Sequence, residues 1–253
     1  MGQPFDTFAC SEQRRSEDLQ QWRNASIYHQ NKALYSGYLT PILRYNTHTK
    51  PLSAGLIMTV ILMFLPLAAI FFILRKRYPH FDVRLTLILS SALWGLLLVL
   101  ITEISSLFHA FNYRTLSAAW GFLSGGLGVM ALYRWKKIRL PSFRLTVLQW
   151  IQIVCIAGIA IITLVIAVIS APNNWDAMVY HMSRAAHWVQ NESVAHYPTS
   201  ILWQLYHPPF AEFQIAHLQI LSGGDYLSQI PQWLSMIGCV IGISLITKQL
   251  GGS

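Results

Sequence analysis

Charge is scarce in this sequence. Only 11% of the 253 residues are charged, whereas 54% are hydrophobic. The apolar residues form runs that are longer than the core helix of a globular protein needs, which excludes soluble domains and indicates a polytopic membrane protein. Hydrocarbon offers backbone amides no hydrogen-bond partners, so segments that cross it should be helices. We therefore predict an all-α transmembrane fold.

Cysteine is also rare, and its three copies, Cys10, Cys155 and Cys239, lie far apart. No metal-ligand spacing is present, so neither a metal nor another cofactor is expected. Two of the cysteines lie inside apolar runs, where buried and inert thiols are expected. The first residues lack the apolar stretch of a secretory signal peptide.

Basic residues outnumber acidic ones, giving a net charge of +8. They stand mainly in short segments beside the apolar runs, where lysine and arginine set membrane topology and contact anionic headgroups. Membrane lipids, and not nucleic acid, are therefore the expected partners of this charge.

Five apolar segments are candidates to cross a hydrocarbon layer of ~30 Å. They are residues 52–74, about 85–104, about 116–133, 145–171 and about 230–246. The predicted organisation is a polar tail over 1–51, three spans with short loops over 52–144, and a region 145–253 that consists of a span, a large loop over 172–226 and a final span. In the third span, glycines should offer a close-packing face: Gly125, Gly126 and Gly128.

Orientation follows from lysine and arginine. The 75–84 segment has four of these residues and the 134–144 segment has five, but the 172–226 loop has only Arg184. The first two segments should be cytoplasmic and the large loop extracytoplasmic. This arrangement places the 1–51 tail outside as well, although the tail carries six basic residues.

The large loop has the most unusual composition. It holds five of the nine histidines and four of the ten acidic residues. Two of its segments have the three-to-four-residue apolar spacing of helices, from Asp176 to Gln190 and from Phe210 to Leu221. With Trp203 and Tyr206 as interfacial aromatics, we expect both helices to lie near the membrane plane.

Individual residues of the loop allow more than one interpretation. Asp176, Tyr180 and Arg184 recur every four residues and should share a helix face. Asp176 fits either a general base or a residue that caps the helix, which Asn173 or Asn174 can also do. Arg184 fits either an interfacial anchor or a phosphate clamp.

The histidines of the loop are most simply explained by surface or headgroup contacts. They are His181, His187, His196, His207 and His217.

Several motifs occur in a fixed order. An apolar run is followed by PNNWDAMVYHMSRAAHWVQN, then AHYPT, LYHPPFAEF and LSGGD. This series resembles the membrane glycosyltransferases of the GT-C superfamily, family 39-like, which include protein mannosyltransferases and lipid A aminoarabinose transferases. The resemblance covers about residues 145–250.

The resemblance implies an enzyme of hexosyltransferase type that uses a polyprenyl-phosphate-sugar donor. Asp176 matches the catalytic carboxylate that follows a span. The same motifs assign substrate binding to Tyr180, His181, Arg184, His207 and Glu212. The acceptor would be a hydroxyl of a lipid, glycan or protein outside the cytoplasm, and the location would be a bacterial inner membrane.

The family's members carry further spans after this point, so the resemblance predicts that the chain is an amino-terminal fragment. The alternative is a non-catalytic membrane module that binds lipid headgroups or an assembly partner through the loop.

Overall fold

The computed structural model describes residues 54–133, 146–170, 172 and 174–252. All of these residues lie in the compact unit Thr49–Ser253. Every regular element among them is a helix. The predicted tail over 1–51 and the basic 134–144 segment lie outside the described residues.

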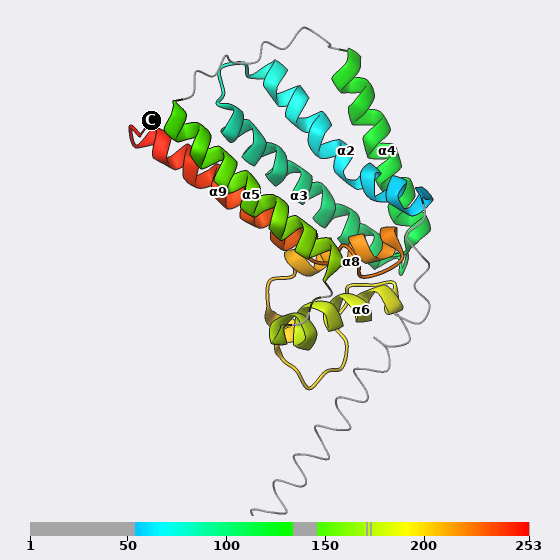
Figure 1. The fold of residues 1–253 in the computed structure, drawn as a ribbon. Coiled ribbons are helices and arrows are strands. Elements are labelled where there is room, and N and C mark those ends of the chain that lie inside the picture. Colours follow the sequence, from blue (N-terminus) through cyan, green and yellow to red (C-terminus); the bar gives the residue numbers. More distant parts are fainter. Residues whose placement is uncertain (1–53, 134–145, 171, 173, 253) are drawn as a thin grey trace, which may run out of the picture. The chain divides into compact units, whose positions relative to one another are not determined.

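Five helices are long and apolar enough to cross a membrane, as the sequence predicts. They are α2 (Ala54–Arg77), α3 (Val83–Leu107), α4 (Tyr113–Tyr133), α5 (Val147–Ile169) and α9 (Ile230–Gln249). Figure 1 shows these helices side by side, with α6 and α8 at one end. The protein is therefore an integral membrane protein by composition and by helix length.

Both loop segments are helical, as predicted. The first consists of a π-helical turn, η1 (Ala177–His181), and α6 (Met182–Asn191); the second is α8 (Phe210–Ser222). A short helix, α7 (Trp203–Tyr206), lies between them.

The core lies where α8 packs against the ends of α2, α3 and α4. Trp94 of α3 stacks on Trp120 of α4 with ring centroids 6.2 Å apart and donates from its indole nitrogen to the Met63 carbonyl, 2.8 Å away. Leu218 and Leu221 of α8 are buried in the same cluster. The loop is thus anchored in the helix bundle and does not merely rest on it.

Helix α8 is more deeply packed than the sequence indicates. A helix that lies on an interface keeps one polar face in water, but ten of the thirteen residues of α8 are buried. The helix ends at Gly223, whose φ of 72° suits a residue without a Cβ atom. A side chain there would also approach Leu56, because an added Cβ atom would lie 3.3 Å from that leucine.

Two predictions about small residues were wrong. Cys155 of α5 and Cys239 of α9 are exposed and not buried. An added Cβ atom at Gly125, Gly126 or Gly128 would meet no atom within 4 Å, so these glycines of α4 form no close contact with the described residues.

Candidate functional site

The site begins directly after α5, where the chain enters the large loop. The Asn174 side-chain oxygen accepts a hydrogen bond of 2.7 Å from the backbone N–H of Ala177, and so caps the loop helix. Asp176 makes no capping hydrogen bond and its side chain is exposed. Asn174 therefore does the capping that the sequence allowed for Asp176, and the Asp176 carboxylate is left at the surface.

The π turn changes which residues share a face. The backbone N–H of Met182 donates to the carbonyl of Ala177, five residues earlier, so the turn is wider than in an α-helix. The prediction that Asp176 and Arg184 share a face was wrong for this reason, since Asp176 is exposed and Arg184 is buried.

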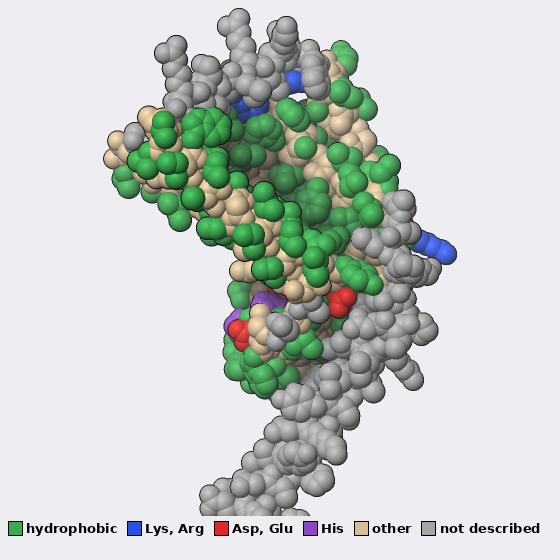
Figure 2. All heavy atoms as spheres, viewed as in Figure 1, with side chains coloured by type: hydrophobic (Ala, Val, Ile, Leu, Met, Phe, Trp, Pro, Cys, Tyr) green, Lys and Arg blue, Asp and Glu red, His purple; other side chains and the backbone are tan. Residues whose placement is uncertain are grey.

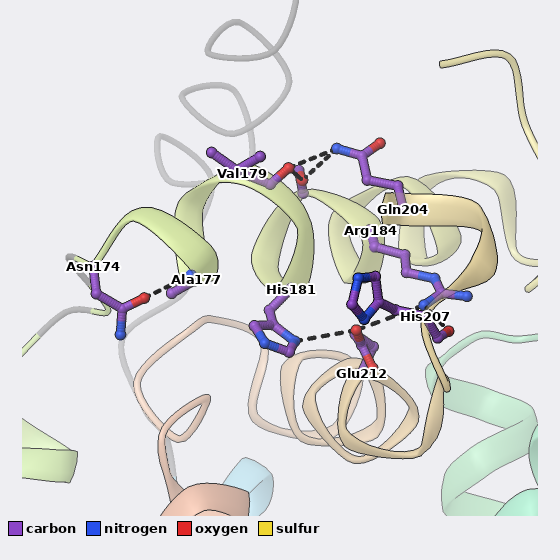
Figure 3. A network of polar contacts seen from close by, with 9 residues as sticks. Asn174, Ala177, Val179, His181, Arg184, Gln204, His207 and Glu212 are labelled. Carbon is purple, nitrogen blue, oxygen red and sulfur yellow. Dashed lines mark hydrogen bonds and ion pairs between the residues drawn. The ribbon is translucent and has the colours of Figure 1, made fainter. Parts of the chain in front are cut away.

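A buried carboxylate stands at the centre of the loop. The side chain of Glu212 is only 1% exposed and comes from the first turn of α8. Its Oε1 atom lies 3.1 Å from His181 Nδ1 and 3.6 Å from a terminal nitrogen of Arg184. Figure 3 shows the three side chains converging from two helices. The charge of Glu212 is thus balanced by Arg184, as a buried carboxylate requires.

Arg184 is held inside the protein. Its guanidinium donates a hydrogen bond of 2.8 Å to the carbonyl of His207 and lies 4.7 Å from the centre of the Trp188 ring. An interfacial anchor would keep its charged end in water, so this location does not fit that interpretation.

Four aromatic rings extend from this cluster toward the surface. The ring of Tyr180 lies 3.9 Å from that of His181 and 5.1 Å from that of His207, which in turn stacks on Tyr206 at 4.8 Å. Burial raises the pKa of Tyr180, and the negative charges of Asp176 and Glu212 raise it further. Tyr180 therefore lies within the electrostatic influence of both carboxylates.

Gln204 is a site residue that the sequence did not reveal. It is buried in α7, and its amide nitrogen donates to the Val179 carbonyl (2.7 Å) and to Ser183 (2.9 Å). Its amide oxygen accepts hydrogen bonds from Tyr197 and Thr199. Gln204 thereby fixes the π turn in place. The only signal in the sequence is a polar residue within the apolar and aromatic run ILWQLY.

His217 was wrongly expected at the surface. It is fully buried in α8, accepts a hydrogen bond of 3.0 Å from the Trp120 indole at Nδ1, and faces Thr102 with Nε2 at 2.8 Å. The indole only donates, so Nδ1 carries no proton. Burial lowers the pKa of His217 to about 3. This residue is a neutral link between α8 and two spans and not a headgroup contact.

The remaining histidines differ in exposure. His196 is exposed, as expected. His187 is half-buried against the ring of Tyr197 at 4.2 Å, and burial lowers its pKa. No three histidine, cysteine or acidic side chains within the described ranges come together as a metal site would require.

Taken together, these contacts define a polytopic integral membrane protein with a polar site at the end of its spans. The site offers an exposed carboxylate, a part-exposed imidazole and a wall of aromatic rings. Comparison of the chain with family models, with curated proteins and with solved structures gives no match. Any function must therefore be argued from the site itself.

Proposed function

We propose that this chain is part of a membrane glycosyltransferase that takes a sugar from a polyprenyl-phosphate-sugar donor. The observation that carries this proposal is the position of Asp176. Its carboxylate is exposed in the first turn after α5, a candidate span. A lipid-linked donor keeps its phosphate at headgroup depth, and a base beside the sugar must stand just beyond the end of a span.

The chemistry assigns one role to Asp176. Its carboxylate takes the proton from the acceptor hydroxyl as the hydroxyl oxygen bonds to the anomeric carbon. The bond between that carbon and the phosphate oxygen breaks on the opposite face, and polyprenyl phosphate leaves with the electron pair. Transfer therefore inverts the anomeric carbon. General-base catalysis of this kind contributes roughly 10²- to 10⁴-fold to a rate.

The neighbours of Asp176 support this role. Tyr180 lies within the electrostatic reach of its carboxylate, and Tyr180 stacks on His207, which stacks on Tyr206, so that the three rings form a row of apolar faces. Figure 2 shows hydrophobic side chains over the spans and acidic and histidine side chains on the loop part of the same face. A donor with a lipid tail and a polar head needs both kinds of surface.

The substitution Asp176→Asn tests the proposal. In protein placed in nanodiscs, we expect transfer from radiolabelled polyprenyl-phosphate-mannose or -glucose to fall by roughly 10²- to 10⁴-fold, because the amide cannot accept the proton. Binding of the donor should change little. Asp225→Asn, at the other end of the loop, is the matched control and should retain activity.

A non-catalytic lipid-binding module is the second candidate, favoured by three exposed aromatics: Trp203, Tyr206 and Phe210. Such rings suit an interface between water and lipid. If the protein binds polyprenyl phosphates without turnover, this second function is the better account of the loop. If Asp176→Asn turns over within a few-fold of the native protein, Asp176 is not the base.

A further inference from the structure

Glu212 and His181 form a hydrogen-bonded pair, here called the dyad. This dyad has no role in the general-base step assigned to Asp176. We propose that His181 accepts a hydrogen bond from a hydroxyl of the donor's sugar, and that Glu212 is the positioning residue that prepares it to do so. This inference rests on the proposed function and names the group that would recognise the sugar.

The tautomer of His181 follows from its partner. An ionised carboxylate only accepts hydrogen bonds, so the proton of the 3.1 Å contact sits on His181 Nδ1. In the neutral ring, Nε2 then carries no proton and has a lone pair that can accept a hydrogen bond. Arg184 lies 3.6 Å from the same carboxylate oxygen and supplies a positive charge that balances that of Glu212.

The lone pair on Nε2 is available to a ligand. The side chain of His181 is 31% exposed, and within the part of the chain that the structure describes no hydrogen bond occupies Nε2. The Tyr180 ring, 3.9 Å away, covers the imidazole and limits its rotation. A fixed lone pair favours a hydroxyl, which can donate, over a phosphate oxygen, which cannot.

His181 and the proposed base belong to the same loop helix. Asp176 directly precedes the π turn, and His181 is the last residue of that turn. Tyr180, the neighbour of His181, is influenced by the charges of both Asp176 and Glu212. A sugar held by Asp176 therefore has His181 about one helical turn further along the chain.

The cluster of Glu212, His181 and Arg184 retains unused hydrogen-bonding capacity. Glu212 Oε2 and Arg184 Nε are buried and have no hydrogen-bond partner among the described residues. Buried polar atoms are nearly always paired, and exceptions gather at functional sites. This second observation, independent of the first, also indicates that the cluster is built to serve more than packing.

The test compares binding of two probes, polyprenyl-phosphate-mannose and bare polyprenyl phosphate of equal length, by tryptophan fluorescence in nanodiscs. Trp175 is exposed beside Asp176 and serves as a reporter. His181→Asn keeps a donor near the Nδ1 position for Glu212 but removes the Nε2 acceptor. We expect it to weaken binding of the sugar-linked probe by roughly three- to tenfold, the effect of one hydrogen bond, and to leave bare polyprenyl phosphate within twofold.

Two further variants test the dyad itself. His181→Gln places an amide near the Nε2 position and should restore part of the lost discrimination. Glu212→Leu should reproduce the selective loss, while Glu212→Gln, whose oxygen can still accept from Nδ1, should retain it. If Glu212→Leu does not fold, the two His181 variants decide the matter.

Each outcome has one meaning. Equal weakening of both probes by His181→Asn would show a structural role and overturn the inference, as would unchanged binding of the sugar-linked probe. If the native protein itself does not distinguish the two probes, sugar recognition is absent and the proposed function fails with it. If Asp176→Asn remains active while His181→Asn loses discrimination, only the assignment of the base is wrong.

Discussion

Helices α5 and α8 invert the usual relation between polarity and burial. Helix α5 carries no charged residue, and most of its side chains are exposed, with Ala167 its one buried residue. Helix α8 contains Glu212, Gln214, His217 and Gln219, and yet most of it is buried. In water, the more apolar helix would occupy the interior.

The inversion shows which solvent surrounds each helix. Lipid tails are as apolar as the side chains of α5, so a helix facing them gains nothing by leaving them. Polar side chains of α8 need partners, and they find them in the Trp120 indole, Thr102 and Arg184. The interior of this protein is thus where most of the polar side chains of α8 find their partners.

The largest expected effect concerns membrane topology. The contrast between α5 and α8 requires that α5 crosses the membrane, and the predicted topology places the loop that contains α8 outside the cytoplasm. In a background without native cysteines, His196→Cys should react fully with an impermeant thiol reagent added to intact cells. His80→Cys, in the basic 75–84 segment, should react only after the membrane is opened. Both positions are exposed in the structure. The reverse pattern would place the loop in the cytoplasm.

A pair of truncations tests the contrast in packing. Leu218→Ala in α8, at a side chain 1% exposed, should lower the free energy of unfolding by about 2–5 kcal/mol, because it leaves a cavity. Ile162→Ala in α5, at a side chain 62% exposed, should change it by less than about 0.5 kcal/mol. Denaturation in mixed micelles measures both. Equal losses would mean that α5 is packed against protein and not against lipid.

The smallest effect is the pH dependence that His217 confers. Because its folded pKa is lowered to about 3, the unfolded chain binds a proton below the ordinary histidine value of about 6.5 and the folded chain does not. The stability from this residue is present above about pH 6.5 and declines as the pH falls toward 3, by at most about 1.4 kcal/mol per pH unit. Unfolding at pH 7, 6 and 5 measures the slope.

The variant His217→Gln should lose this slope while keeping a polar side chain in the same place. His196→Gln, at an exposed histidine, is the control and should behave as the native protein does. A slope that survives in His217→Gln would assign the pH dependence to another group.

The sequence predicted the spans and the loop helices because those features depend on local composition. A charge-free run such as 145–171 can cross hydrocarbon only as a helix that satisfies its own backbone hydrogen bonds. Pro209 and Gly223 mark the two ends of α8. The ends of the spans differ from the predicted ends by a few residues, as frayed helix termini do.

The site was less predictable because it depends on distant partners. The spacing of Asp176 and Arg184 is that of a regular helix, and only the Gln204 bond to the Val179 carbonyl shows why a wider turn is held there. The burial of His217 depends on Trp120, 97 residues earlier. No local pattern reports such contacts, and so His217 and His196 look alike in the sequence.

Most of the helices that α8 packs against are synthesised before α8 itself. Of the helices it packs against, α2, α3, α4 and α6 all precede it in the chain, and only α9 follows. The hydroxyl of Thr59 in α2 donates to the Leu221 carbonyl near the end of α8, at 2.9 Å. When α8 is synthesised, the helices that form most of its packing surface have therefore already been made. The polar side chains of α8 can then form their hydrogen bonds at once, and they do not stay unpaired in lipid until later helices are made.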